Sequence, residues 1–133
     1  MSHLTSYYIT IRPAVHGSIY HLDTHLATAL LLLDTGADMT AVSHSLLRNL
    51  NLQPVSTGPG KTIYGKKVVT EYYKDFKLLL TADDNVIQHI ILPEISCVKG
   101  TDYDFPVVIG MDVLSMCTFL LDGQSKHFTL TFP

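Results

Sequence analysis

Apolar and β-branched residues occur along this chain in short runs that turn residues interrupt. Residues 6–12 have the composition of a strand and stop at Pro13, which is typical of a strand that ends where a backbone donor is lost. A second strand is expected over residues 17–22. Leucines dominate residues 26–33, and Asp-Thr-Gly follows at once, so this run is predicted to be a buried strand rather than a helix.

The middle of the chain is predicted to continue as short elements. Residues 39–43 have the pattern of another strand, and Ser43 is in position to cap a short helix over residues 44–50. Glycines and prolines at residues 54–60 predict a loop. The β-prone stretch that follows contains Tyr-Gly-Lys-Lys at residues 64–67, which resembles the tip of a hairpin.

The second half of the chain is again strand-like. Residues 76–80 and 86–92 are predicted to pair as a hairpin around a turn at residues 82–85. The remaining elements, in order, are a loop over 93–104, a strand over 106–110, a short helix over 111–116 and a closing hairpin of 118–123 with 127–132. The whole pattern predicts one all-β domain over residues 1–133 with one or two short helices.

The composition and charge of the chain argue against some classes of function. Apolar residues make up 47% of the 133 residues, and the net charge of −3 provides no basic surface for nucleic acid. The longest apolar run, residues 26–33, is far shorter than a membrane span, and no signal sequence opens the chain, so we expect an intracellular protein that binds neither nucleic acid nor membrane. Cys97 and Cys117 are expected to be buried thiols, with one disulfide as the alternative.

The candidate chemistry lies directly after residues 26–33. Asp34 is at the mouth of a buried strand, where an ionised carboxylate needs donors or a partner charge. Gly36 allows a backbone N–H to approach that carboxylate, Thr35 adds a hydroxyl that can bond across an interface, and the small Ala37 leaves space for a ligand. Alone, this tripeptide is more often an ordinary turn, and only its context indicates catalysis.

That context resembles the retropepsins, the retroviral-type aspartic proteases. The motif at residues 31–37 is followed, at residues 107–114, by a second apolar-apolar-Gly motif before a helix signal, and residues 119–130 resemble the last hairpin of the family. The resemblance covers roughly residues 26–130 and implies a closed β-barrel protomer. It places one structural strand behind the catalytic loop, with Val108, Ile109 and Gly110 as its second motif.

The resemblance also implies a mechanism. The chain contains one Asp-Thr-Gly, whereas the chemistry uses two carboxylates that share a proton, so the second Asp34 must come from another copy in a two-fold homodimer. The implied activity is aspartic endopeptidase cleavage of an extended polypeptide, without metal or other cofactor. The implied site consists of the catalytic residues Asp34, Thr35 and Gly36 and the substrate-binding residues Ala37, Asp38, Tyr64 and Gly65.

The sequence departs from the viral pattern in two places. Retroviral members commonly carry an arginine after the glycine of the second motif, where it pairs with the residue at the position of Asp38, but here Met111 occupies that place. The glycine-rich flap tip of the viral enzymes is also absent. We place the flap within residues 56–73, with its tip near Gly65.

Other functions remain open at this point. A non-catalytic dimerisation or peptide-binding module on the same fold is the main alternative, and a barrel that binds small molecules is another. Release of the domain from a larger polyprotein is an open question as well. His21 and His25 have helical metal-ligand spacing but lie in a strand or turn and have no third ligand, so no metal site is expected.

Overall fold

The computed structural model describes residues 1–7, 12–61 and 65–133. These residues form ten strands and two helices of a single turn each, so the prediction of an all-β domain with short helices is confirmed. The strands are β1 His3–Tyr7, β2 Ala14–His21, β3 Thr24–Leu33, β4 Ala41–Val42, β5 Ser56–Lys61, β6 Lys67–Thr81, β7 Ile87–Val98, β8 Val107–Ile109, β9 Thr118–Asp122 and β10 His127–Thr131, and the helices are α1 His44–Leu47 and α2 Met111–Leu114.

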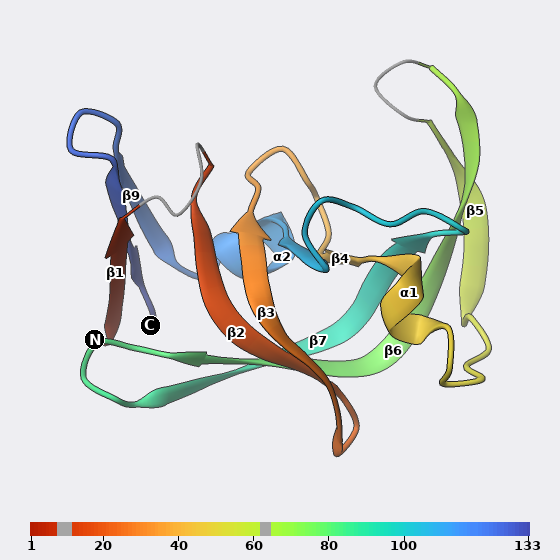
Figure 1. Cartoon of the computed structure of the whole chain (residues 1–133), viewed down its shortest axis with the longest axis horizontal. Helices are drawn as coiled ribbons and strands as arrows, with labels where there is room; N and C mark the ends of the chain where they lie inside the picture. The colour runs from red at the N-terminus through yellow and green to blue at the C-terminus, as the bar shows by residue number, and fades with distance from the viewer. Residues whose placement is uncertain (8–11, 62–64) are drawn as a thin grey trace.

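Six strands close into a barrel. They are hydrogen-bonded in the order β2-β3-β8-β4-β7-β6, and β6 pairs back with β2, which completes the ring. The barrel is mixed, because β3–β8 and β4–β7 are parallel while the other pairs are antiparallel. β5 is added outside the ring on β6 and rises with it as an arm at the right of Figure 1. The closed barrel therefore follows the prediction.

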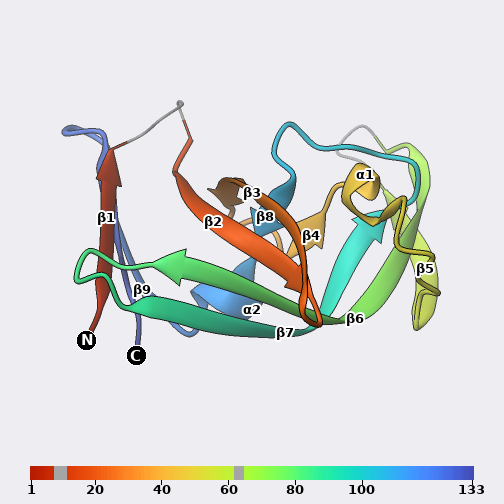
Figure 2. The same cartoon turned by 60° about the horizontal axis from the view of Figure 1, so that its bottom comes forward.

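β6 and β7 form a long two-stranded ribbon that runs along the bottom of the molecule (Figure 2). At one end the ribbon turns under the small sheet that contains β1, and at the other end β6 continues into its pairing with β5. The ribbon thus extends from the small sheet at one end of the molecule to the β5–β6 arm at the other end.

The small sheet has the order β1-β10-β9, and it joins the two ends of the described chain. β1 pairs antiparallel with β10 from His3↔Thr131 to Tyr7↔His127, and β10 pairs with β9 as the expected closing hairpin. Both termini consequently lie together at the lower left of Figure 1.

The core fills the barrel and continues under the small sheet. Its largest fully buried side chains are Val15, Ile19, Leu31, Val42, Phe76, Leu78, Leu80, Leu92, Ile95, Ile109, Phe128 and Leu130. Cys97 is buried in this core and Cys117 packs against it, and both are free thiols. Burial raises the pKa of Cys97 to about 11, so this thiol is neutral at ordinary pH. No helix in the described part of the chain is long and apolar enough to span a membrane.

The first strand begins earlier than the sequence pattern indicates. The prediction placed it at residues 6–12, whereas β1 begins at His3 and Arg12 lies in a bend; residues 8–11 are outside the described part. The register is set by β10, since each β1 residue has a partner there. Long-range pairing therefore overrides local β-propensity at this position.

Two predicted loops are partly strand. Residues 54–60 were expected to be a loop, but β5 includes Pro59 with glycines on both sides. β5 is the edge strand of its sheet, where a missing proline N–H leaves no ladder bond unmade. Residues 93–104 were also expected to be a loop, but β7 continues to Val98.

Pro93 is tolerated within β7 because its partner strand bends at the same level. The β6–β7 register is unchanged on both sides of it, from Phe76↔Leu92 to Lys74↔Glu94. Asp75, opposite Pro93, has a positive φ of 71°. Its carbonyl oxygen accepts the N–H of Leu22 at 2.9 Å, so it does not need a donor from Pro93.

Gly17 of β2 provides a test of how tightly the barrel is packed. A Cβ at Gly17 would lie 2.5 Å from Leu80 Cδ2, 2.8 Å from Leu31 Cδ1 and 3.0 Å from the carbonyl oxygen of Leu79. Both leucine side chains are 0% exposed and have no space to move. We expect Gly17→Ala to lower the free energy of unfolding by about 1–3 kcal/mol, measured by chemical denaturation. A Cβ at Gly123 meets nothing within 4 Å, so Gly123→Ala is the matched control.

Candidate active site

The two sequence motifs lie side by side at one end of the barrel. β3 and β8 pair in parallel with Leu31 opposite Val107 and Leu33 opposite Ile109. The residue that follows β3, Asp34, donates its backbone N–H to the carbonyl oxygen of Ile109 at 2.9 Å. This pairing places Asp34, the acidic residue of the first motif, beside the second motif.

The Asp34 turn holds its own side chain. The N–H of Gly36 donates to Asp34 Oδ1 at 2.8 Å, and the N–H of Ala37 donates to the Asp34 carbonyl oxygen at 3.2 Å. A Cβ at Gly36 would lie 3.1 Å from Oδ1, so a glycine lets the backbone come this close. Among the described residues, no donor bonds to Oδ2. One oxygen of Asp34 is therefore fixed, and the other remains available to a ligand.

The loop after Asp34 is clamped to the start of α2 by main-chain bonds. The N–H of Met111 donates to the carbonyl oxygen of Ala37 at 2.7 Å, and the N–H of Asp112 donates to that of Asp38 at 3.1 Å. A Cβ at Gly110 would lie 2.7 Å from the Ala37 oxygen. The glycine of the second motif is needed here because any side chain would push the two segments apart.

A buried side-chain bond completes this clamp. Thr40, which is 0% exposed, donates its hydroxyl to Asp112 Oδ1 at 2.8 Å and its N–H to Asp112 Oδ2 at 3.0 Å. The same hydroxyl accepts the N–H of Gly110 at 3.2 Å. Sequence reasoning missed both Thr40 and Asp112.

This clamp takes the place of the ion pair that the viral pattern makes with an arginine at the position of Met111. Met111 is 37% exposed, and the side chain of Asp38 is also exposed. The loop is tied to α2 by the carboxylate one position later, at Asp112, and its partner is a neutral hydroxyl instead of a cation.

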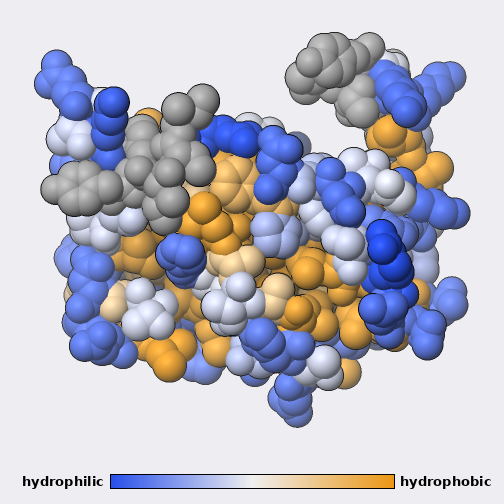
Figure 3. Space-filling view, viewed as in Figure 1, coloured by the Kyte–Doolittle hydropathy of each residue, from blue (hydrophilic) through white to orange (hydrophobic). Residues whose placement is uncertain are grey.

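A cavity of about 440 Å³ opens beside Asp34. Its floor is apolar and its rim is polar and charged. The floor consists of Leu32, Ala37, Ala41, Phe105 and Val108, and the rim of Arg12, Asp34, Asp102, Tyr103 and Asp104. The space-filling view shows a notch in the upper outline beside the β5–β6 arm, with apolar surface exposed below it (Figure 3). Ala37 of the first motif and Val108 of the second motif both line the cavity.

Ser43 positions the outer wall of this cavity. It precedes α1, as predicted, but its side chain makes no capping bond, and α1 ends at Leu47 instead of residue 50. Its hydroxyl instead donates to the carbonyl oxygen of Phe105 at 3.2 Å and accepts the N–H of Tyr103 at 2.8 Å. The capping prediction is wrong because the buried Ser43 hydroxyl bonds to the backbone of Tyr103 and Phe105 instead of the first turn of α1.

The charged rim is held only loosely. Arg12 Nη2 lies 3.4 Å from Asp104 Oδ2, and both side chains are well exposed, so this ion pair contributes little to stability. The Arg12 guanidinium also lies 5.0 Å from the centre of the Phe105 ring. The N–H of Ser45 bonds to Asp102 and lowers the pKa of that carboxyl, so the rim keeps a negative charge even in mild acid.

The other predicted site residues lie apart from Asp34 or outside the described part. Tyr64 belongs to residues 62–64, which the structure does not describe, whereas Gly65 lies near the end of the β5–β6 arm with a φ of 78°. His25 bonds to Thr28 at 2.8 Å, and His21 packs on an aromatic ring. Among the residues described, no three His, Cys, Asp or Glu side chains are grouped as metal ligands would be.

Comparison with solved structures gives the fold a name. A retropepsin-like aspartic protease from Rickettsia conorii superposes with a TM-score of 0.61 over 98% of this chain and 99% of that chain, at 14% sequence identity. The chain has a retropepsin-like fold. The foamy viral protease–reverse transcriptase also matches, with a TM-score of 0.40 and 19% identity, over 77% of this chain and 12% of that chain. No protein-family model and no curated protein sequence matches.

On this retropepsin-like fold, the hydroxyl of Thr40 can be tested directly. Thr40→Val keeps the shape of the side chain but leaves the N–H of Gly110 without its acceptor and removes one of the two donors to Asp112 Oδ1. We expect a loss of about 1–3 kcal/mol in the free energy of unfolding, because buried groups then lack a bond. Thr40→Ser keeps the hydroxyl and should lose less. A Thr40→Val variant that is as stable as wild type in urea denaturation would show that the hydroxyl bonds do not contribute.

Proposed function

We propose that this chain is an aspartic endopeptidase that acts as a two-fold homodimer, with one Asp34 from each copy. The observation that carries the proposal is the state of this carboxylate: Gly36 fixes Oδ1, no described donor bonds Oδ2, and Asp34 lines the 440 Å³ cavity. The retropepsin-like fold supports it. A single Asp-Thr-Gly in the chain requires the second carboxylate to come from a partner.

The chemistry follows from two close carboxylates that share one proton. The ionised member removes a proton from a water molecule, whose oxygen attacks the carbonyl carbon of the peptide bond. The protonated member donates its proton to the carbonyl oxygen, which gives a neutral tetrahedral intermediate. When that intermediate collapses, one of its hydroxyl groups gives its proton to the ionised carboxylate as the carbonyl re-forms. The C–N bond breaks, and the leaving nitrogen takes the proton of the other carboxyl, so the dyad again holds one proton. Gly36 contributes by holding the Asp34 carboxylate in one orientation.

The cavity suggests the type of substrate. Its floor of Leu32, Ala37, Ala41, Phe105 and Val108 favours an apolar side chain next to the cleaved bond. We propose that an extended polypeptide lies across this floor, with Asp38 near its backbone, and that the β5–β6 arm with Gly65 covers it as a flap. A non-catalytic peptide-binding module on this fold is the alternative, and activity measurements distinguish the two.

Replacement of Asp34 is the direct test of catalysis. Asp34→Asn keeps the size of the side chain but removes the shared proton in both copies at once. We expect peptide cleavage to fall by several orders of magnitude, while the thermal midpoint stays the same or rises because two close carboxylates no longer repel. Full peptidase activity in this variant would refute the protease assignment.

Asp38→Asn is the matched control, because it makes the same chemical change in an exposed side chain of the same loop. We read Asp38 as a substrate or dimer contact, so its variant should raise KM or weaken dimerisation and leave kcat nearly unchanged. A large loss of kcat in the Asp38 variant, together with unfolding of the Asp34 variant, would reverse these two roles.

The dependence of activity on pH tests the shared proton. We expect kcat/KM to follow a bell with an optimum at roughly pH 4 to 6, because the reaction requires one ionised and one protonated carboxylate. A chelator should leave the rate unchanged. If activity disappears with a chelator and zinc restores it, the site around His21 and His25 becomes the candidate instead.

A further inference from the structure

The cavity beside Asp34 combines an apolar floor with a rim that is mainly negative. Among the described residues that line it, Asp34, Asp102 and Asp104 carry carboxylates, and Arg12 is the one cation. The floor between them is aliphatic and aromatic. A lysine or arginine side chain has the matching chemistry, because its stem is aliphatic and only its head is charged.

The rim already holds one guanidinium, which belongs to the protein itself. Arg12 Nη2 lies 3.4 Å from Asp104 Oδ2, and the guanidinium lies 5.0 Å from the centre of the Phe105 ring, which is part of the floor. A cation near an aromatic ring and beside a carboxylate is held by both groups. This internal contact shows which kind of side chain the rim and floor accept together.

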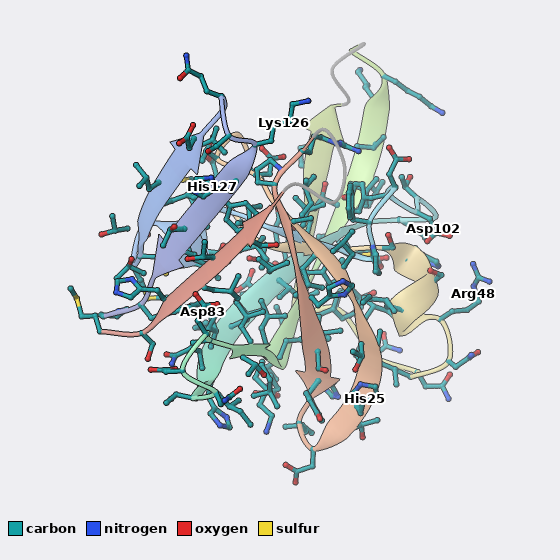
Figure 4. The ribbon with its side chains drawn as sticks, turned by 60° about the vertical axis from the view of Figure 1, so that its left-hand side comes forward. His25, Arg48, Asp83, Asp102, Lys126 and His127 are labelled. Atoms are coloured by element: carbon teal, nitrogen blue, oxygen red, sulfur yellow. The ribbon has the colours of Figure 1, made fainter. Side chains whose placement is uncertain are left out.

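Asp102 is the rim carboxylate that is left for a substrate. Its Oδ1 accepts the N–H of Ser45 at 2.8 Å, and this bond is the main cause of its lowered pKa. Among the described residues, no lysine, arginine or histidine forms an ion pair with it. His44 and Arg48 favour its ionised form only from a distance. Figure 4 shows Asp102 on the loop above α1 and Arg48 at the end of that helix.

The loop that carries this carboxylate, residues 99–106, is fastened to the start of α1. The N–H of Ser43 donates to the carbonyl oxygen of Pro106 at 2.9 Å, and the N–H of His44 donates to that of Thr101 at 3.0 Å. The Ser43 hydroxyl adds two bonds to the same loop. The rim charge is therefore held in place beside the floor before any ligand arrives, which lowers the entropic cost of binding.

We propose that this cavity selects polypeptides with a lysine or arginine next to the cleaved bond, and that Asp102 determines this specificity. The inference rests on the protease proposed above and names its substrate class. The aliphatic stem of the substrate residue lies on Leu32, Ala37 and Val108, and its charged head pairs with Asp102 at the rim. One side chain thus satisfies the apolar floor and the negative rim together.

Paired peptides that differ at one position test the preference. One peptide has lysine next to the cleaved bond and the other has norleucine, which keeps the stem but lacks the charge. We expect kcat/KM of the wild-type chain to be roughly tenfold higher for the lysine peptide, because a charge-assisted bond forms only with lysine. The advantage should shrink as salt is added, since the rim is exposed. Equal values for the two peptides at low salt overturn the proposal.

Asp102→Asn tests the residue. The amide oxygen can still accept the Ser45 N–H, so the wall of the cavity stays in place while the charge is lost. We expect the ratio of the two kcat/KM values to fall to about one, with the thermal midpoint unchanged. A ratio that stays at the wild-type value in this variant assigns the selection elsewhere and overturns the role of Asp102.

Asp84→Asn is the matched control. Asp84 is also an exposed carboxylate that accepts a backbone N–H, that of Val86 at 3.1 Å, and its pKa is also lowered mainly by that bond. It lies in the β6–β7 turn, and it does not line the cavity. The lysine advantage should persist in this variant. An equal loss in both variants shows an effect of net charge and overturns the specific contact.

Binding to the Asp34→Asn variant separates this inference from the proposed function. Fluorescence anisotropy of the same labelled peptides needs no cleavage. If the wild-type chain cleaves nothing, but the Asp34→Asn variant binds the lysine peptide more tightly and loses this preference when Asp102→Asn is added, the specificity stands and the protease is refuted. A protease that cleaves both peptides equally stands without the specificity. If neither peptide binds, both proposals fail.

Discussion

β3 and β8 lie side by side in the barrel, and their parallel register brings the Asp34 turn beside Gly110. The candidate site depends on this pairing. The strands before both motifs are buried, so the backbone groups of Asp34 must find partners within the protein. Ile109 accepts the Asp34 N–H, and Ala37 accepts the Met111 N–H. A carboxylate that needs a fixed position is thereby attached to the most buried part of the fold.

The clamp between the Asp34 loop and α2 uses few charges. Thr40 and Asp112 bond to each other and, through the Thr40 hydroxyl, to Gly110. The half-buried Asp112 carboxylate accepts several donors and so needs no cation, and the direction of each bond fixes the loop in one conformation. Met111 can consequently be apolar at the position where the viral pattern has an arginine. The loop can be rigid without the ion pair of the viral pattern.

Asp34 borders two spaces with different surroundings. The larger cavity has an apolar floor under a charged rim, which suits a peptide side chain with its backbone at the rim. The smaller groove is lined by Leu33, Asp34 and Thr35 and by Phe119 and Leu121 of β9, so it lies between the Asp34 turn and β9.

The sequence by itself determined the features that depend on neighbouring residues: the Gly36 bond to Asp34, the β6–β7 turn and the β9–β10 hairpin. The resemblance in the two motifs led to the closed barrel. Tertiary structure decided the position of β1, the strand character around Pro59 and Pro93, the bonds of Ser43 and the Thr40–Asp112 pair. These depend on which distant backbone groups need a partner. Donors and acceptors that meet across seventy residues leave no periodic pattern in the chain, and only the closed barrel brings them together.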